Sequence, residues 1–310
     1  MVKSVKSTPL VYLVTPVFNR KVHTLKYLAS LGSQTYKNFR VVIVDDASTD
    51  GTKEAIQDQY PNAILLEGDG NQWWSGGTNL GVKKALEDKA DYILTVNDDL
   101  EVESDYIESI VKDAKAHPKS LIGSIVLDKK NPLHVWYFGA DFDQKTGVMK
   151  HISGLRKDFT KITKTEWLTG MGVLIPAEVF QKVGVFNSKD FPQYFGDVEL
   201  SLRAKEAGYR LLVSPRCAVI SDVESNWVSK SLQKPRMSFW YQLFFTIRSP
   251  YHLSSRVKFY KNYWPGNYRM ALRKLYFGDM KTLYRAWLSS WVHSKKWLKW
   301  SVTIKRKVKK

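Results

Sequence analysis

The 310-residue sequence has a single cysteine, Cys217, and no run of about 18 apolar residues. One cysteine excludes an intrachain disulfide and a zinc site built from cysteines, and it suits a reducing compartment. Without a long apolar run, no membrane-spanning helix is predicted. The first residues carry two lysines and a short apolar stretch but no small-residue cleavage site, so we expect no signal peptide.

Acidic residues are almost absent from the C-terminal part of the chain. Residues 228–310 contain 20 Lys and Arg side chains and one acid, Asp279, whereas residues 1–227 contain 28 basic and 29 acidic side chains. The net charge of +18 therefore resides in this C-terminal part. We expect two domains, a neutral body at 1–227 and a basic region at 228–310.

The basic region is also rich in aromatic residues, and its apolar side chains fall at helical spacing from about 280 onward. Leu283, Trp287, Trp291 and Leu298 could share one face of a helix. A basic amphipathic helix with interfacial aromatics suits an anionic membrane surface, the partner that we favour. Packing on the body or on a second copy of the chain is the next alternative, and nucleic acid is the least favoured.

The body alternates apolar runs with segments of helical periodicity. Strands are predicted at 10–17, 40–44, 63–66 and 91–96, and helices at 22–33, within 47–60, at 75–88 and at 103–116. This alternation predicts an α/β fold, a mostly parallel sheet with helices on both faces. A hairpin with its turn at 143–147 is predicted within a later insertion, 128–165.

Polar residues follow three of the predicted strands, at the edge where such sheets bind ligands. They are Thr15-Pro16-Val17-Phe18-Asn19, Asp45-Asp46 and Asn97-Asp98-Asp99. The first strand lacks the glycine-rich dinucleotide fingerprint, so an NAD-type site is not expected. The carboxylates favour a nucleotide with a metal-bound diphosphate, because hard divalent cations prefer carboxylate oxygens. Alternatively, Asp98 and Asp99 merely cap the next helix.

These motifs, taken in order, resemble the family 2 glycosyltransferases with a GT-A fold, whose sheet is Rossmann-like. The resemblance covers roughly residues 9–222 and rests on TPVFNR, VDDASTDGT, NDD, WLTGMGVLIP at 167–176 and FGDVELSLRAKEAGYRL at 195–211. The segment NQWWSGGTNLG at 71–81 is similar to that of rhamnosyltransferase-like members.

The resemblance implies how a pyrimidine nucleotide would be held. Asp45 would accept a hydrogen bond from the base. Thr15 and Pro16 would line the base pocket, with Asn19 nearby.

The resemblance also implies a divalent metal, Mn²⁺ or Mg²⁺. Asn97-Asp98-Asp99 occupies the D-x-D position of the family, with Asn in first place. Asp99 would bind the metal, and Asn97 or Asp98 would face the ribose or donor sugar. Asp222 lies near the position where the family often has a histidine ligand. Either it replaces that ligand, or the diphosphate and water complete the shell.

The tryptophan–glycine segment is predicted to border the donor sugar. Gly76 and Gly77 would let the nucleotide or sugar approach the backbone closely. Asn79, near the predicted helix start, would reach the ligand through its amide. Of the two tryptophans, we expect one in the core and the other, Trp74, at the site.

Asp197 is the candidate general base. The resemblance aligns it with the catalytic carboxylate of the family, which would take the proton of an acceptor hydroxyl. Its alternative role is favourable charge at a helix N-terminus. Trp167, Thr169 and Gly170 would form the acceptor side, although Trp167 could equally be a core residue.

Together these features predict an inverting, metal-dependent glycosyltransferase. It would move rhamnose or another hexose from a dTDP- or UDP-sugar to a lipid-linked or cell-surface glycan. We expect it in the cytoplasm, peripherally bound at the inner face of the membrane. The alternative is a non-catalytic glycan- or lipid-binding module on a transferase scaffold. Asn97, Gly196 and the missing histidine, all departures from the family pattern, keep that alternative open.

Overall fold

The computed structural model describes residues 8–143, 147–223, 238–264 and 266–307, with side chains through residue 290. The chain divides into two compact units. The first comprises residues up to 142 together with 149–223, and the second comprises 143–148 and 224–310. The division after Val223 lies close to position 227, where the sequence changes from neutral to basic.

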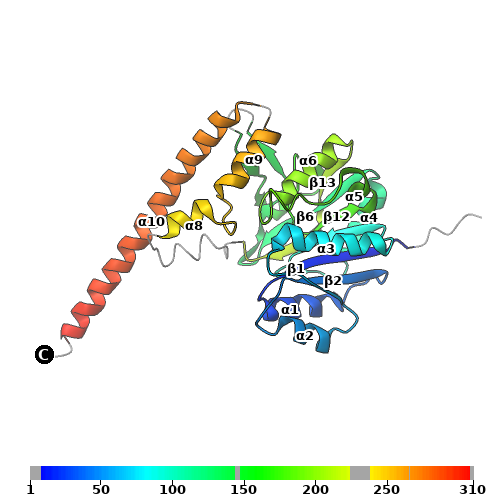
Figure 1. Cartoon of the computed structure of the whole chain (residues 1–310), viewed down its shortest axis with the longest axis horizontal. Helices are drawn as coiled ribbons and strands as arrows, with labels where there is room; N and C mark the ends of the chain where they lie inside the picture. Colours follow the sequence, from blue (N-terminus) through cyan, green and yellow to red (C-terminus); the bar gives the residue numbers. More distant parts are fainter. Residues whose placement is uncertain (1–7, 144–146, 224–237, 265, 308–310) are drawn as a thin grey trace, which may run out of the picture. The chain divides into compact units, whose positions relative to one another are not determined.

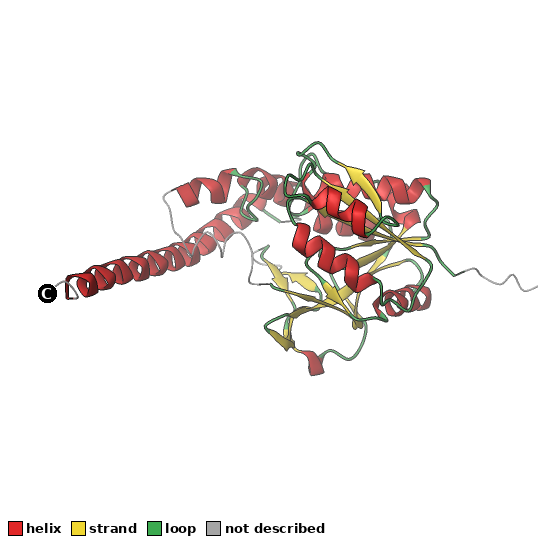
Figure 2. Ribbon diagram, turned by 90° about the horizontal axis from the view of Figure 1, so that it is seen from below, coloured by secondary structure: helices red, strands yellow, loops and turns green. Residues whose placement is uncertain are grey.

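The first unit is an α/β domain built around one large sheet (Figures 1 and 2). Its strands are β1 (Val11–Val17), β2 (Phe39–Asp45), β3 (Ile64–Glu67), β4 (Tyr92–Thr95), β5 (Glu101–Val102), β6 (Ser120–Asp128), β7 (Asn131–Tyr137), β8 (Ala140–Phe142), β9 (Met149–His151), β10 (Gly154–Leu155), β11 (Thr163–Lys164), β12 (Val173–Pro176) and β13 (Arg210–Ser221). Its helices are α1 (Lys21–Leu31), α2 (Thr52–Gln59), α3 (Trp73–Glu87), α4 (Tyr106–Ala116), α5 (Ala177–Val183), α6 (Gly196–Glu206) and the 3-10 turn η1 (Arg156–Asp158).

The sheet is parallel in its first half and mixed in its second. The strand order is β10-β7-β6-β12-β4-β1-β2-β3, and β13 lies alongside β6. β1 pairs in parallel with both β2 and β4, and β2 pairs in parallel with β3. β12 runs antiparallel to both of its neighbours, β4 and β6. The predicted α/β fold with a mostly parallel sheet is confirmed.

Helices cover both faces of this sheet. α1 and α2 pack together on one side of β1 and β2, and α3 lies on the other side (Figure 1). This follows from right-handed crossovers, because the chain adds β2 and β3 on one side of β1 and then returns to add β4 on the other. α3 lies very close to the sheet: a Cβ added at Gly81 would come within 2.4 Å of Val14 Cγ1.

The end of β1 and the start of α3 can be compared directly with the sequence prediction. β1 ends at Val17, as predicted, with Thr15 and Pro16 inside the strand. Proline is tolerated there because the pairing of β1 with β4 already ends at Val14, so the missing N–H interrupts no bond on that side. α3 begins at Trp73 rather than near Ser75, so both tryptophans lie in its first turn and both glycines inside the helix.

A β-hairpin stands within the predicted insertion. β8 and β9 pair antiparallel, with Ala140 opposite His151 and Phe142 opposite Met149. The backbone bond from Gly147 N–H to Asp143 O, 2.7 Å, closes the connection where the turn was predicted. Residues 144–146 of that turn lie outside the described residues.

The second unit is mainly helical from residue 238 onward. It contains α8 (Ser238–Phe245), α9 (Leu253–Tyr263) and the 40-residue α10 (Tyr268–Lys307). Phe239 and Leu243 of α8 bury their side chains with Leu283 of α10, and Trp240 and Trp287 pack against this cluster. The helical structure predicted for the basic region is therefore present in α10.

Candidate functional site

The three polar strand ends predicted from the sequence meet at one edge of the sheet. Val17 at the end of β1 lies opposite Asp45 at the end of β2, and Val14 of β1 lies opposite Thr95 of β4. The chain places β2 and β3 on one side of β1 and then β4 on the other side, so the direction in which strands are added reverses at β1. In open α/β sheets, ligands bind at such a switch point beyond the carboxyl ends of the strands.

The loops after β1 and β2 are tied together beside Asp45. The exposed Asn19 donates its N–H to Ser48 Oγ at 2.8 Å and accepts the Thr49 N–H at its Oδ1 at 2.7 Å. Asp45 is 2% exposed, and its Oδ1 accepts the Ser48 N–H at 3.0 Å. In the described part of the chain no hydrogen bond reaches its other oxygen. Asp45 therefore retains an acceptor for a ligand N–H, as its predicted role requires.

Thr15 does not face this edge, contrary to the prediction that it lines the base pocket. Its side chain is fully buried, and its hydroxyl lies 3.4 Å from the Tyr27 hydroxyl in the core. Alternation along β1 is the reason, since successive side chains point to opposite faces of a strand. Pro16 is half-buried and faces α3, where a Cβ added at Gly77 would come within 2.8 Å of its Cβ.

Gly77 and Asn79 of α3 serve the packing of the protein. Gly77 has no room for a side chain because the helix crosses β1 at Pro16, and a Cβ at Gly76 would meet the Gln72 amide at 2.9 Å. The Asn79 amide donates to Phe186 O at 2.8 Å and accepts the Phe186 N–H at 2.9 Å. These contacts correct the expectation that Gly77 and Asn79 address a ligand, because close contact within the protein accounts for both. At Gly76 the neighbour is the movable end of the Gln72 side chain, so its role stays a prediction.

Trp74 lies at the centre of the candidate site. Its indole Nε1–H donates to Asn97 Oδ1 at 2.9 Å, and its ring meets the edge of Phe186 with centroids 5.2 Å apart. A Cβ added at Gly170 would come within 2.4 Å of this ring. Both Trp73 and Trp74 are half-buried, so the expectation that one is a core residue is wrong. The Trp73 backbone N–H is instead held by Asp46 at 3.1 Å.

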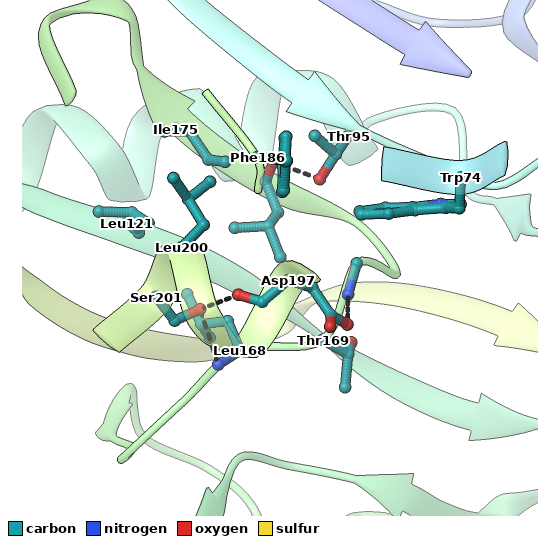
Figure 3. Close-up of a pocket in the computed structure, with 12 residues that line it drawn as sticks. Trp74, Thr95, Leu121, Leu168, Thr169, Ile175, Phe186, Asp197, Leu200 and Ser201 are labelled. Carbon is teal, nitrogen blue, oxygen red and sulfur yellow. Dashed lines mark hydrogen bonds between the residues drawn. The ribbon is translucent and has the colours of Figure 1, made fainter. Parts of the chain in front are cut away.

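Asp197 stands at the start of α6, in the wall of a pocket that Trp74 and Gly170 also line (Figure 3). Its Oδ2 accepts the Gly170 N–H at 2.7 Å, and its Oδ1 accepts the Val198 N–H at 2.9 Å. Burial raises the pKa of Asp197, against the lowering effect of these backbone hydrogen bonds. Thr169 lines the same pocket and bonds the Met171 N–H through its hydroxyl at 3.3 Å.

Trp167 is a core residue, which decides between the two roles predicted for it, contact with the acceptor and packing in the core. It is 3% exposed, and its ring lies 5.9 Å from that of Tyr137 and 5.2 Å from that of His151. Its predicted contact with an acceptor is therefore not supported by the geometry. The acceptor-side residues that do reach the pocket are Thr169 and Gly170.

Arg20, which the sequence analysis did not single out, lies on the two consecutive acids after β4. Its Nε donates to Asp98 at 2.7 and 2.8 Å, and its Nη2 to Asp99 Oδ2 at 3.1 Å. The Thr24 hydroxyl adds a bond of 3.1 Å to Asp98, which is 5% exposed. Burial raises the pKa of Asp98, and Arg20 opposes that rise. Asp98 thus points inward to Arg20, which corrects the expectation that it faces the donor.

Asp99 and Asp222 are the carboxylates open enough to hold a divalent cation. The Asp99 side chain is 42% exposed and that of Asp222 is 45% exposed. β13 runs antiparallel to β5 with Ile220 opposite Glu101, and two further steps in this register would bring Asp222 opposite Asp99. Within the described ranges, no three His, Cys, Asp or Glu side chains are grouped so that they could hold a metal ion. The donor set fits a cation that also binds substrate phosphates, as Mg²⁺ commonly does.

Arg20 is expected to stabilise the fold of this edge. Arg20→Gln removes the partner of a buried carboxylate and should lower the free energy of unfolding by about 1–3 kcal/mol. Chemical denaturation at neutral pH measures the change. The control is Lys26→Gln, which breaks the pair of Lys26 with Glu101, with side chains 64% and 38% exposed. It should cost about 0–1 kcal/mol. Equal losses in the two variants would contradict the role given to Arg20.

Comparison with known proteins agrees with this geometry. The family model described as Glycosyl transferase family 2 matches residues 12–184, more than half of the chain. Over 234 residues, the chain is 23% identical to N-acetylglucosaminyl-diphospho-decaprenol L-rhamnosyltransferase of Mycobacterium tuberculosis strain H37Rv. That alignment covers 69% of this chain and 76% of the relative.

Two solved structures show the same fold. A mannosyltransferase of Pyrobaculum calidifontis, solved with GDP-Man and Mn²⁺, is similar with a TM-score of 0.55 and 18% identity, over 92% of this chain and 83% of that one. GalNAc-T7, solved with UDP, GalNAc and Mn²⁺, gives a TM-score of 0.58 and 14% identity, over 86% of this chain and 54% of that one. The GT-A-like architecture is thus shared, and by its family match the chain belongs to glycosyl transferase family 2 and is a glycosyltransferase.

Proposed function

We propose that the chain is an inverting glycosyltransferase in which Asp197 is the general base. The observation that carries this proposal is the place of the Asp197 carboxylate, in the wall of a pocket that Trp74 and Gly170 also line. Two backbone N–H groups fix its orientation, so it cannot rotate freely. A fixed carboxylate with a raised pKa is better suited to take a proton near neutral pH than an ordinary surface aspartate.

The reaction follows from this placement. The oxygen of an acceptor hydroxyl attacks the anomeric carbon of the donor sugar, and its proton passes to Asp197. The new C–O bond forms as the bond from the anomeric carbon to the diphosphate oxygen breaks, and the electron pair leaves with the nucleoside diphosphate. Attack from the face opposite the leaving group inverts the anomeric carbon. Trp74 would cover a C–H face of a sugar while its Nε1 stays bonded to Asn97.

The donor would lie over the carboxyl ends of β1, β2 and β4. Asp45 would bind the pyrimidine base, and Pro16 and Asn19 would border it. Asp99, with Asp222, would hold Mn²⁺ or Mg²⁺. When bound, such a cation stabilises negative charge on the departing diphosphate. Arg20 is bonded to both acids, to Asp98 through Nε and to Asp99 through Nη2, and Asp99 is the exposed one of the two.

For the substrates we propose a dTDP- or UDP-hexose donor, with rhamnose foremost, and a glycan on a polyprenyl diphosphate as acceptor. The support is the similarity to the mycobacterial rhamnosyltransferase, whose name specifies a decaprenol-linked acceptor. A lipid-linked acceptor would place the chain at the inner face of the cell membrane, in the cytoplasm. None of the described helices combines the length and the apolar content that crossing a bilayer requires. We therefore propose peripheral attachment.

A donor panel tests the proposal. The full chain is mixed with UDP-, dTDP-, GDP- and ADP-sugars, with Mn²⁺, with Mg²⁺ or with EDTA, and nucleotide release is followed. We expect metal-dependent release from one pyrimidine donor. Absence of release and of metal-dependent binding for every donor would overturn the proposal in favour of a non-catalytic glycan- or lipid-binding module on a transferase scaffold.

A further inference from the structure

One face of α10 carries large apolar side chains that the described residues leave at least 38% exposed. Its described members, with exposed fractions, are Met270 (54%), Phe277 (69%), Met280 (38%) and Tyr284 (50%). A helix turns about 100° per residue, so these four side chains lie within an arc of about 80°. The spacing of seven between Met270, Phe277 and Tyr284 continues in the sequence at Trp291 and Leu298. We call Met270, Phe277, Met280 and Tyr284 the apolar stripe.

The packed face of α10 is a different one. Ala271, Leu272, Leu275 and Leu283 are each less than 10% exposed, and about 100° of rotation per residue centres them on the side opposite the stripe. Leu283 joins the cluster with Phe239 and Leu243 of α8. α10 is therefore apolar on two opposite faces. One is buried in the core of its own unit, and the other stays exposed, although the Tyr284 ring lies 6.4 Å from that of Trp240 of α8.

Basic residues border the apolar stripe. Lys274, Lys281 and Arg285 follow one edge, Arg269 lies beyond the other edge, and Arg273 lies within the arc with its guanidinium 5.8 Å from the Phe277 ring centroid. All five are exposed. The one acid from residue 228 onward, Asp279, is on the packed side, where it pairs with Arg256 at 2.7 Å. The exposed face thus combines apolar and aromatic groups with charge of a single sign.

We propose that the apolar stripe and its basic border bind an anionic lipid bilayer, with α10 lying in the plane of the interface. Helices of this kind bury their apolar face at the boundary of headgroups and acyl chains, while Lys and Arg extend to the lipid phosphates. The proposed function enters only in explaining why the chain would reside at a membrane, since an acceptor on a polyprenyl diphosphate is itself anchored there.

Charge decides between a bilayer and a second copy of this chain. In a pair of α10 helices joined through their stripes, the residues on either side of the seam would come together. These are Lys274, Lys281 and Arg285 on one edge and Arg269 on the other. Like charges at such positions oppose association, and the stripe side of the described helix offers no acid to pair with them. An anionic headgroup layer supplies the missing negative charge.

The test uses the full chain and extruded vesicles, without donor sugar. Vesicles of phosphatidylcholine alone are compared with vesicles that also contain phosphatidylglycerol, by co-sedimentation at low and at raised salt. We expect binding to the phosphatidylglycerol vesicles, weakened by salt. In the triple variant Phe277→Gln, Met280→Gln, Tyr284→Gln, the lipid concentration for half-binding should rise at least about tenfold, because burying one large apolar side chain supplies that factor.

A control removes three apolar side chains of similar or greater exposure from the other unit. It combines Val22→Gln, Leu133→Gln and Leu155→Gln, at positions 78%, 70% and 48% exposed, and should bind vesicles like the parent chain. A second variant, Lys274→Gln, Lys281→Gln, Arg285→Gln, should lose most of the preference for phosphatidylglycerol. Far-ultraviolet circular dichroism establishes that each variant keeps its helices.

Three results would overturn the proposal. One is equal vesicle binding by the parent and by the triple variant Phe277→Gln, Met280→Gln, Tyr284→Gln, called here the stripe variant. Another is a dimer in sedimentation velocity that the stripe variant abolishes while vesicle binding persists, which would assign the stripe to a second copy. The third is a stripe variant that loses binding to a single-stranded oligonucleotide while its vesicle binding stays unchanged. That result would assign the apolar stripe to nucleic acid. Nucleotide release is measured without vesicles, so failure of either proposal is seen independently of the other.

Discussion

Asp197→Asn is expected to lower kcat for glycosyl transfer by about 10²- to 10⁴-fold, the usual contribution of a positioned general base. The variant keeps the size of the side chain and an oxygen for the Gly170 N–H, but it cannot take the acceptor proton. KM for the donor should change little, because the donor nucleotide is proposed to lie over the strand ends. Initial rates with a saturating acceptor measure the loss.

Glu206→Gln is the matched control for this prediction. It makes the same chemical change on the same helix, at the exposed last residue of α6. Its kcat should equal that of the parent chain, since exposed positions away from a site tolerate such a change. If Asp197→Asn retained the parental kcat under the same conditions, the carboxylate would have no role beyond charge at the helix N-terminus.

The pH dependence of kcat/KM in the parent and in Asp197→Asn tests the catalytic role further, because a purely structural role of Asp197 would not change it. Burial raises the pKa of Asp197 above the usual value for aspartate, about 3.9. The free enzyme needs the ionised form, so the acid limb of kcat/KM should lie above that value in the parent and vanish in Asp197→Asn. A raised pKa in the folded state also means that stability falls as pH rises from the unfolded-state pKa through the folded-state one. At neutral pH this effect favours the Asn variant, whereas the loss of the acceptor for the Val198 N–H opposes it.

The course of the chain through the sheet was predictable because it is encoded locally. The strand VYLVTPV is buried along almost its whole length, and RVVIVD ends at the same edge beside it. Short buried runs of β-branched residues, each followed by a helical pattern, leave few arrangements other than a parallel sheet. The polar residues that follow such strands must meet, so the location of the site followed from the fold.

The roles of individual side chains depended on partners far away in the sequence. Arg20 finds Asp98 across 78 positions, and Asn79 finds Phe186 across 107. Either pair looks unremarkable in a single sequence, because Arg and Asn are common in loops and at helix starts. Asn79 was therefore assigned to a ligand when its amide is fully used by the backbone at Phe186.

The start of α3 shows the same limit at a helix boundary. Asp46 Oδ2 accepts the N–H groups of Gln72 and Trp73 at 3.0 and 3.1 Å, and its Oδ1 accepts that of Gly70 at 2.8 Å. A carboxylate from another loop thus satisfies donors that a helix normally leaves to its own cap residue. Because the cap is not adjacent in sequence, the pattern around Ser75 predicted the start two residues late.

Asp99→Asn is expected to abolish the response of the chain to Mn²⁺ or Mg²⁺, with nucleotide release falling at least about 10³-fold, because the electrostatic aid of a metal ion amounts to several kcal/mol. The physical reason is the difference in exposure between the two acids. Asp98 is buried against Arg20, whereas Asp99 is 42% exposed and meets Arg20 through Oδ2, so Asp99 is the more accessible hard ligand. EDTA should reduce the parent chain to the same level.

Metal binding itself separates this prediction from a general loss of activity. Titration of Mn²⁺ in the presence of the preferred nucleoside diphosphate, followed by electron paramagnetic resonance, should show weaker binding in Asp99→Asn. Asp58→Asn, at an exposed position of α2, should bind Mn²⁺ like the parent.

Asp222→Asn tests the register argument that brings Asp222 opposite Asp99: weaker Mn²⁺ binding would make Asp222 the second protein ligand. Parental affinity would instead leave the remaining coordination to phosphate and water. Unchanged Mn²⁺ binding in Asp99→Asn would remove the metal from this strand end altogether, since Asp98 has both oxygens committed to Arg20 and Thr24.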